Sequence, residues 1–238
     1  MKDKLTIVIP CKNEKEYISR TLREIGGQYG IEGVRIIISD AQSTDGTIGE
    51  ILRIKKEDGL DISVIKGGLP SFGRNQGAKL ASTELILFLD ADITFTSNRS
   101  VYSAIKKLER KNLDLVGTFP SYKGEFDIRA SIMFFINSIS TAILSVISPF
   151  AIGGFFLIRK DKFESLGGFD ELAEQSEDWL LSRKIGIEKF GLLPFLITQD
   201  NRRFKRFGYL NMIRLIIRNL YHMNSETHFR KNSGYWGN

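Results

Sequence analysis

The chain has 238 residues, of which 42% are hydrophobic and 26% are charged. This length and composition exclude a disordered or collagen-like chain and predict a globule with one α/β domain, or one domain with an appendage. The single cysteine, Cys11, excludes an internal disulfide and a cysteine-cluster metal site, and no charged-then-apolar leader opens the sequence. We therefore expect the chain to stay in the cytoplasm.

The net charge of +6 arises in the C-terminal part of the chain. Residues 199–238 contain eight Lys or Arg and two Asp or Glu, whereas the first 198 residues contain 26 of each sign. A neutral body with a basic tail indicates contact with an anionic surface, such as nucleic acid or the cytoplasmic leaflet of a membrane.

Four short apolar runs rich in Ile, Val and Leu alternate with segments of helical character. They cover residues 5–9, 34–39, 62–65 and 85–89. Because these runs are apolar on both faces, the βαβα order predicts a doubly wound, mostly parallel α/β sheet flanked by helices. Ligands bind such sheets at the carboxyl ends of the strands, so the loops that follow the strands are the places to search for chemistry.

The loops after the first two predicted strands carry polar side chains. Pro10 is expected to end the first strand, and Asn13 or Glu14 can cap the helix that follows. Asp40 ends the second strand, where a carboxylate can accept hydrogen bonds from a ribose hydroxyl or a base N–H. Asp45 begins an Asp-Gly turn, which is its favoured role. Capping and turn formation remain alternatives to ligand binding here.

The next two loops add a cation and a carboxylate pair. Arg74 lies near a predicted helix start, where free N–H groups and a guanidinium can bind phosphate, unless Arg74 pairs with an aspartate instead. Asp90 and Asp92 follow the fourth strand and can turn toward one point to hold Mg²⁺ or Mn²⁺. The four strand ends together indicate a nucleoside diphosphate site.

Residues 130–158 form a stretch of 29 residues without a charge. This length allows one membrane crossing. Six Asn, Ser and Thr residues interrupt the predicted helix, however, and Pro149 and the Gly153-Gly154 pair break it. We expect a partly buried helix whose apolar face lines a groove or touches a membrane without crossing it.

The C-terminal tail interleaves cations and aromatics and then predicts an amphipathic helix over residues 209–221. Four apolar residues share one face of this helix: Leu210, Ile213, Ile217 and Leu220. Arg214 and Arg218 lie on another face, and such helices bind anionic lipid interfaces. A helix docked on the core with a solvated basic face fits the pattern equally well. Nucleic acid is not expected, because nothing in the neutral body extends the basic patch.

Six blocks in chain order resemble glycosyltransferase family 2, a group of metal-dependent nucleotide-sugar enzymes with the GT-A fold. They are IVIPCKNE at 7–14, DAQSTDGT at 40–47, GRNQG at 73–77, LFLDAD at 87–92, RKDKFESLGGFD at 159–170 and SEDW at 176–179. Each block is unspecific by itself, but the ordered set spans roughly residues 5–190. Ala41 departs from the pattern, since many relatives have a second aspartate at that position.

The resemblance implies a UDP- or GDP-sugar donor and a divalent cation, Mn²⁺ or Mg²⁺. The residues implied to bind the donor are Pro10, Asn13, Glu14, Asp40, Arg74 and Asp90. Asp92 is the expected direct metal ligand, with Asp90 beside it. His222 is the candidate third ligand, against which an ordinary structural role is favoured.

The resemblance also implies an acceptor half. Asp178 is the candidate general base for an inverting transfer, and Gly153, Gly154 and Glu177 are candidate acceptor-binding residues. A plain helix N-terminus is the favoured interpretation of Glu177 and Asp178 when they are taken without the other blocks. With a lipid phosphate as acceptor, Asp178 would orient rather than deprotonate. A membrane-crossing helix at 130–158 would separate Asp90 from Asp178, which argues against a crossing.

We therefore expect a GT-A domain at residues 1–198, with a nucleotide-sugar half at 1–95 and an acceptor half at 96–198, followed by a basic amphipathic extension at 199–238. The expected function is transfer of a sugar to a lipid-linked or glycan acceptor by a peripheral enzyme on the inner face of the cell membrane. One alternative is a noncatalytic nucleotide-sugar sensor or membrane scaffold. Another is a sugar-phosphate nucleotidyltransferase, which the lack of a glycine-rich, Arg-containing loop after the first strand disfavours.

Overall fold

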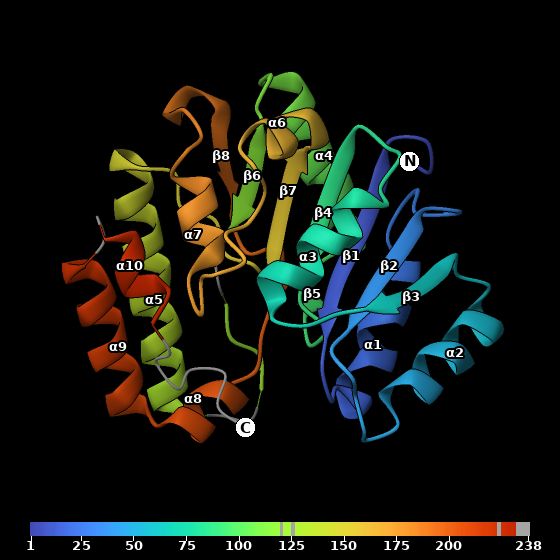
Figure 1. The fold of residues 1–238 in the computed structure, drawn as a ribbon, viewed down its shortest axis with the longest axis horizontal. Helices are drawn as coiled ribbons and strands as arrows, with labels where there is room; N and C mark the ends of the chain where they lie inside the picture. Colours follow the sequence, from blue (N-terminus) through green and yellow to red (C-terminus); the bar gives the residue numbers. More distant parts are fainter. Residues whose placement is uncertain (120, 125–126, 223–224, 232–238) are drawn as a thin grey trace.

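The computed structural model of the chain describes residues 1–119, 121–124, 127–222 and 225–231. Its centre is a seven-stranded sheet with the order β3-β2-β1-β4-β7-β6-β8, and helices cover both faces (Figure 1). Four of the six strand pairings in this sheet are parallel, and β7 is antiparallel to both of its neighbours. The expectation of a mostly parallel α/β sheet is confirmed.

The N-terminal half supplies four parallel strands and the helices that connect them. The strands are β1 (Leu5–Cys11), β2 (Arg35–Asp40), β3 (Ile62–Lys66) and β4 (Leu85–Leu89), and the helices are α1 (Lys15–Gly26), α2 (Thr47–Asp58) and α3 (Pro70–Lys79). The prediction that Pro10 ends the first strand is wrong. The strand continues to Cys11, with Pro10 opposite Ser39, because β1 needs no hydrogen bond from the nitrogen of Pro10 to extend its ladder.

The remaining strands and short helices complete the sheet. They are β5 (Thr94–Phe95), α4 (Ser100–Arg110), β6 (Leu115–Thr118), β7 (Phe155–Arg159), α6 (Lys160–Ser165), α7 (Glu177–Ser182), the 3₁₀ turn η1 (Ile187–Lys189), β8 (Phe190–Leu193) and β9 (Ile197–Thr198). β7 pairs with β4 over residues 155–159 and joins the two halves in one sheet. The small β5–β9 sheet makes a second connection between them.

The core lies on both faces of the large sheet. Ile7 and Ile9 point into the cluster beneath α1, α2 and α4, whereas Val8 points into the cluster with Phe88 and Phe156 on the opposite face. All five side chains are fully buried. This alternation explains why the strands appear as continuous apolar runs in the sequence.

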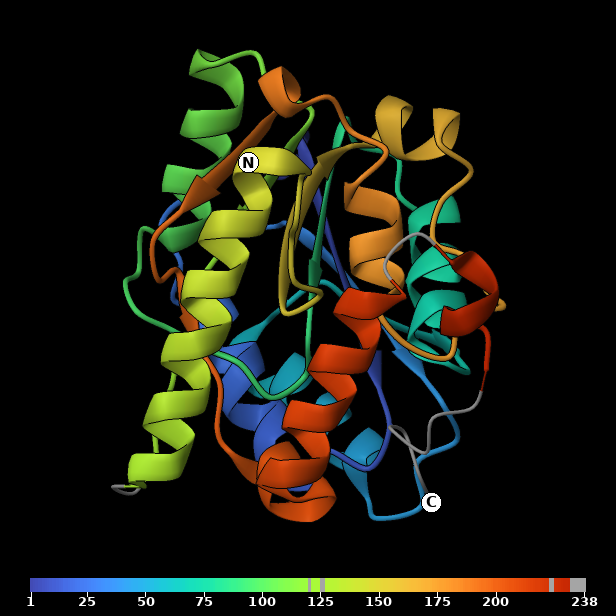
Figure 2. The same cartoon turned by 90° about the vertical axis from the view of Figure 1, so that its left-hand side faces the viewer.

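The remaining helices form one wall of the molecule. They are α5 (Ile128–Ile147), α8 (Arg202–Phe207), α9 (Tyr209–Tyr221) and α10 (Glu226–Phe229). Figure 2 shows α5 and α9 together on the side opposite α2, and Met133 of α5 packs against Met212 and Leu215 of α9. The predicted extension at 199–238 therefore contains helices, although its last residues, 232–238, lie outside the described part.

Candidate active site

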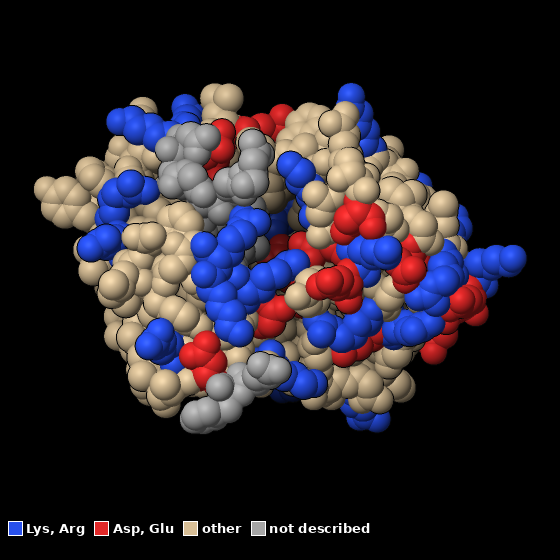
Figure 3. All heavy atoms as spheres, turned by 90° about the horizontal axis from the view of Figure 1, so that it is seen from below, with Lys and Arg blue, Asp and Glu red and all other residues tan. Residues whose placement is uncertain are grey.

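A pocket of about 240 Å³ lies at the carboxyl ends of the strands. Its walls include Arg74, Asp90 and Asp92 from the first half and Gly153 and Asp178 from the second. Figure 3 looks at this edge from below and shows Asp and Glu side chains in a hollow, with Lys and Arg side chains beside it. The fold therefore brings the predicted carboxylates of both halves to one place.

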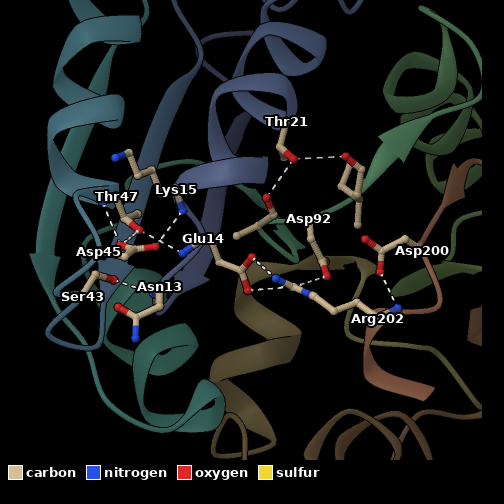
Figure 4. Close-up of polar contacts among 12 residues, drawn as sticks. Asn13, Glu14, Lys15, Thr21, Ser43, Asp45, Thr47, Asp92, Asp200 and Arg202 are labelled. Carbon is tan, nitrogen blue, oxygen red and sulfur yellow. Dashed lines mark hydrogen bonds and ion pairs between the residues drawn. The ribbon is translucent and has the colours of Figure 1, made fainter. Parts of the chain in front are cut away.

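The first two strand loops are tied together by Asn13. Its backbone has φ 55°, a left-handed conformation that Asn tolerates. Its N–H donates to Ser43 Oγ at 2.8 Å (Figure 4), and its Oδ1 accepts from the N–H of Thr44 at 2.9 Å. Asp40 is buried and accepts from the N–H of Ser43 at 3.0 Å. Both residues therefore shape the loops at the strand ends, and neither is among the residues that line the pocket.

Glu14 does not cap α1 with its side chain. It occupies the N-cap position, but its carboxylate makes no capping hydrogen bond, and its N–H donates to Thr47 Oγ1 at 2.9 Å. Asp45 accepts from the N–H groups of Lys15 and Thr47 at 3.1 and 3.0 Å, which is the turn role favoured from the sequence (Figure 4). The Glu14 carboxylate instead points toward Arg202 (Figure 4).

A guanidinium from the C-terminal part, Arg202, joins Glu14 to Asp92. Its Nη1 and Nη2 donate to the two oxygens of Glu14 at 2.9 Å each, and Nη2 also lies 2.9 Å from Asp92 Oδ2. The guanidinium also lies 4.3 Å from the ring centre of Tyr17. Burial raises the pKa of Glu14, and the hydrogen bonds and charge of Arg202 oppose that rise. The sequence placed this cation in the basic tail and did not indicate its contact with Asp92, a residue of the pocket wall.

The loop that carries Asp90 and Asp92 is held by α1. Thr21 Oγ1 lies 2.8 Å from the carbonyl oxygen of Ala91 and 3.1 Å from that of Ile93, so one buried hydroxyl supports both sides of Asp92. The Asp92 side chain then points toward Arg202 (Figure 4).

The donor set suits a divalent cation. Among the described residues, no group of three or more His, Cys, Asp or Glu is arranged to hold an ion. Glu14 and Asp92 nevertheless hold one positive group, the Arg202 guanidinium, between them. Mg²⁺ and Mn²⁺ commonly take one or two carboxylates from the protein and the remaining oxygens from water and phosphate. The residues present therefore fit such an ion together with a diphosphate.

Arg74 bridges the two halves at the pocket wall. Its side chain is 3% exposed, its Nη2 donates to Asp90 Oδ1 at 2.8 Å, and its Nη1 pairs with Glu177. Of the two interpretations left open by the sequence, pairing with an aspartate is the one seen in this structure. Glu177, predicted to bind the acceptor, is among the residues that line the pocket, and its buried carboxylate is the second partner of Arg74.

Asp178 faces the loop before β7. Its Oδ2 accepts from the N–H of Gly153 at 2.6 Å, and its Oδ1 accepts from the N–H of Trp179 at 2.7 Å. Burial and the adjacent negative charge of Glu177 raise the pKa of Asp178 to about 7. A carboxylate with such a pKa can exchange protons near neutral pH, as a general base must.

Gly153 and Gly154 leave room for side chains that approach the pocket floor. A Cβ at Gly153 would lie 2.6 Å from Arg74 Nη2, and a Cβ at Gly154 would lie 2.8 Å from Gln199 Nε2. Gln199 in turn approaches Asp90 Oδ2 at 3.4 Å, a contact that the sequence did not indicate. Pro10, in β1, packs against α3, where its Cβ is 3.6 Å from the Cβ position at Gly73, and it is not among the residues that line the pocket.

The structure does not bring His222 to the aspartates. The His222 ring stacks on His228 with ring centres 4.5 Å apart and meets Tyr221 edge-on. The residues that line the pocket with Asp90 and Asp92 include Asn219 but not His222.

Comparison with known proteins was made for sequence and for structure. The family model described as Glycosyl transferase family 2 matches residues 6–167. An uncharacterised glycosyltransferase of Bacillus subtilis strain 168, YfnE, is 29% identical over 118 residues, which cover 49% of this chain and 30% of YfnE. The validoxylamine A glucosyltransferase of Streptomyces hygroscopicus subsp. jinggangensis is 35% identical over 94 residues, 37% of this chain and 22% of that enzyme. The chain thus aligns with less than a third of either relative.

Two solved structures share the fold over most of this chain. One is the mannosyltransferase PcManGT of Pyrobaculum calidifontis in complex with GDP-Man and Mn²⁺. It has a TM-score of 0.67 at 21% sequence identity, and the match covers 91% of this chain and 65% of the PcManGT chain. The other is S. aureus TarS 1-349 in complex with UDP-GlcNAc, with a TM-score of 0.64 at 19% sequence identity, and the match covers 84% of this chain and 59% of the TarS chain. At these identities the likeness shows the fold, and that fold is GT-A.

Proposed function

The chain belongs to glycosyl transferase family 2 and is a glycosyltransferase, and from this premise we propose that it is a metal-dependent, inverting enzyme. Its donor is a nucleoside diphosphate sugar with uracil or guanine as the base. Its acceptor is lipid-linked or a glycan, and it works on the cytoplasmic face of the membrane.

One observation carries this proposal: carboxylates from both halves line a single pocket. Asp90 and Asp92 follow β4, and Asp178 lies in the first turn of α7. Arg74 makes ion pairs with Asp90 and with Glu177, the neighbour of Asp178. The donor side and the acceptor side are thereby held at a defined separation, as a direct displacement requires.

Asp92, with Asp90 and Glu14 beside it, would hold the divalent cation. The ion, when bound, supplies positive charge that stabilises the leaving nucleoside diphosphate. Asp40 is the last residue of β2, and Asn13 lies in the loop that follows β1. We expect the nucleoside at this edge of the sheet, where the parallel strands end.

Asp178 would accept the proton of the attacking acceptor hydroxyl. Its raised pKa suits this role, and the N–H of Gly153 fixes the orientation of its carboxylate. Attack from the face of the sugar opposite the leaving diphosphate gives inversion at the anomeric carbon. With an acceptor that is already ionised, Asp178 would position it instead.

The proposal is tested by measuring thermal stability and donor hydrolysis with a panel of UDP- and GDP-sugars, with and without Mn²⁺. A cognate donor should raise the melting temperature, because it binds the folded state alone, and the rise should depend on Mn²⁺. Absence of a response to every UDP- and GDP-sugar, in both assays, would contradict the proposed function.

A further inference from the structure

Helix α5 carries its apolar side chains outward. One helix face carries eight large hydrophobic residues that are each 42–76% exposed: Ile128, Ile132, Phe135, Ile136, Ile139, Ile143, Val146 and Ile147. The opposite side buries Ala130, Met133, Phe134 and Thr141, and the less exposed Asn137 and Ser145 lie on that side as well. An ordinary surface helix instead exposes charged and polar residues on its outer face.

Helix α9 extends this apolar surface. Leu210, Ile217 and Tyr221 are exposed by 70%, 61% and 85%, while Met212 and Leu215 are buried against Met133 of α5. Figure 2 shows both helices at the front of the same side of the molecule. We call the exposed apolar residues of α5 and α9 together the α5–α9 face.

The charges of these helices select the partner. Their sequences contain three arginines, Arg129, Arg214 and Arg218, and no Asp or Glu. Arg214 and Arg218 border the exposed apolar row of α9, and both are exposed. Apolar side chains with a cationic border match the interface of an anionic bilayer, because the apolar side chains can insert into the acyl region and the arginines can bind the lipid phosphates.

Helix α5 is long and apolar enough to cross a membrane, but its contacts with the rest of the domain oppose a crossing. Only 22% of its most apolar stretch is buried, so it is not an ordinary core helix. Phe134 and Asn137 of α5 nevertheless line the pocket that contains Asp90 and Asp178. A helix packed along the catalytic domain in this way can lie in the plane of a bilayer surface.

The pocket behind the α5–α9 face is suited to a polar head group. Its lining includes three side-chain amides, those of Asn137 in α5, Asn219 in α9 and Gln175. Gln175 is 2% exposed, and within the described residues its Oε1 has no hydrogen-bond partner. A hydroxyl of an acceptor head group would satisfy this buried oxygen.

We propose that the α5–α9 face docks on an anionic phospholipid bilayer and that the acceptor is a lipid whose head enters the pocket behind it. This inference rests on the proposed function for the acceptor, whereas the docking itself does not need catalysis. It also decides between the two acceptor classes in favour of the lipid-linked one.

The test is flotation of the full chain with vesicles of phosphatidylcholine alone or mixed with phosphatidylglycerol. The wild-type chain should float with the mixed vesicles. The double variant Ile139→Glu/Ile143→Glu should bind the vesicles at least about tenfold more weakly than the wild-type chain, since two charged groups replace methyl groups that the bilayer would bury. Leu52→Glu is the matched control: Leu52 is 53% exposed on α2, on the far side, and its substitution should change nothing.

Equal flotation of the double variant and the wild-type chain would overturn docking through this face. A lipid-free dimer that the same double variant dissociates would also overturn it, because a second copy would then cover the face. Mn²⁺-dependent donor hydrolysis in lipid-free solution is measured on the same samples. If no sample hydrolyses a donor but the wild-type chain still floats with the mixed vesicles, the proposed function is contradicted and the docking surface is supported.

Discussion

At the scale of single residues, Asp178 is the position where catalysis and mere nucleotide binding give different results. Asp178→Asn keeps the shape of the side chain and removes the base, so turnover should fall about 10²–10⁴-fold while donor binding persists. Steady-state kinetics and donor titration measure the two effects. A noncatalytic sensor or scaffold would keep its function in this variant.

The pH dependence follows from the raised pKa of Asp178. A general base must be ionised, so kcat/KM should rise with pH and level off above about 7. Glu177→Gln removes the adjacent negative charge, lowers the pKa of Asp178 and should move this rise to lower pH. A midpoint that stays unchanged in Glu177→Gln would show that another group controls the profile.

Arg202 occupies the place where positive charge is needed, and it therefore competes with a metal. Removing the guanidinium in Arg202→Met frees Glu14 and Asp92, and the affinity for Mn²⁺ without nucleotide should rise about tenfold, since charge-assisted hydrogen bonds contribute about 1.5–3 kcal/mol. Titration followed by the electron paramagnetic resonance of free Mn²⁺ measures this.

The matched control is Arg206→Met, an exposed cation of the same helix α8. It should leave the affinity for Mn²⁺ unchanged. Weaker Mn²⁺ binding by Arg202→Met would show that the arginine supports the metal site rather than competing for it.

At the scale of elements, two helix glycines should respond with opposite sign to alanine. A Cβ at Gly77 in α3 would collide with Val8 of β1, so Gly77→Ala should destabilise the fold by about 1–3 kcal/mol. Gly49 in α2 has open space around its Cβ position, and Gly49→Ala should stabilise by about 0.5–1 kcal/mol. Urea denaturation measures both, and a loss of stability in Gly49→Ala would contradict the packing described here.

The elements also show what sequence patterns can and cannot predict. The first four strands were predictable because each is a short apolar run that ends in polar loop residues. The direction of the apolar face of α5 was left open between a groove and a membrane, because it depends on how Met133 packs against Met212 and Leu215, far along the chain. The position of Arg202 was hidden for the same reason, since its partner Glu14 is 188 residues away.

At the scale of the whole molecule, Arg74 connects the halves through two carboxylates. Arg74→Met would leave Asp90 and Glu177 without their cation in a buried place, and should destabilise by about 3–5 kcal/mol. Arg53 on α2 also pairs with two carboxylates, Glu50 and Glu57, but at the surface, so Arg53→Met should change stability far less. Thermal or urea unfolding compares the two variants, and equal effects would contradict a structural role for Arg74.

The family and the fold of the whole molecule were accessible from six ordered blocks, because such blocks lie in the loops that the sheet brings to one edge. The blocks did not reveal which cations pair with the carboxylates. Arg74 and Arg202, one from each half of the chain, are these cations, and their pairing depends on tertiary contacts between Asp90, Glu177, Glu14 and Asp92.

The antiparallel strand β7 has a consequence for how the enzyme can open. Because β4 and β7 pair over five residues each, the floor of the pocket is one continuous sheet that crosses from one half to the other. A hinge between the halves would have to break this backbone ladder. Motion that keeps this ladder intact is confined to the loops and helices around the sheet, so the radius of gyration of the sheet and its core should stay constant during turnover.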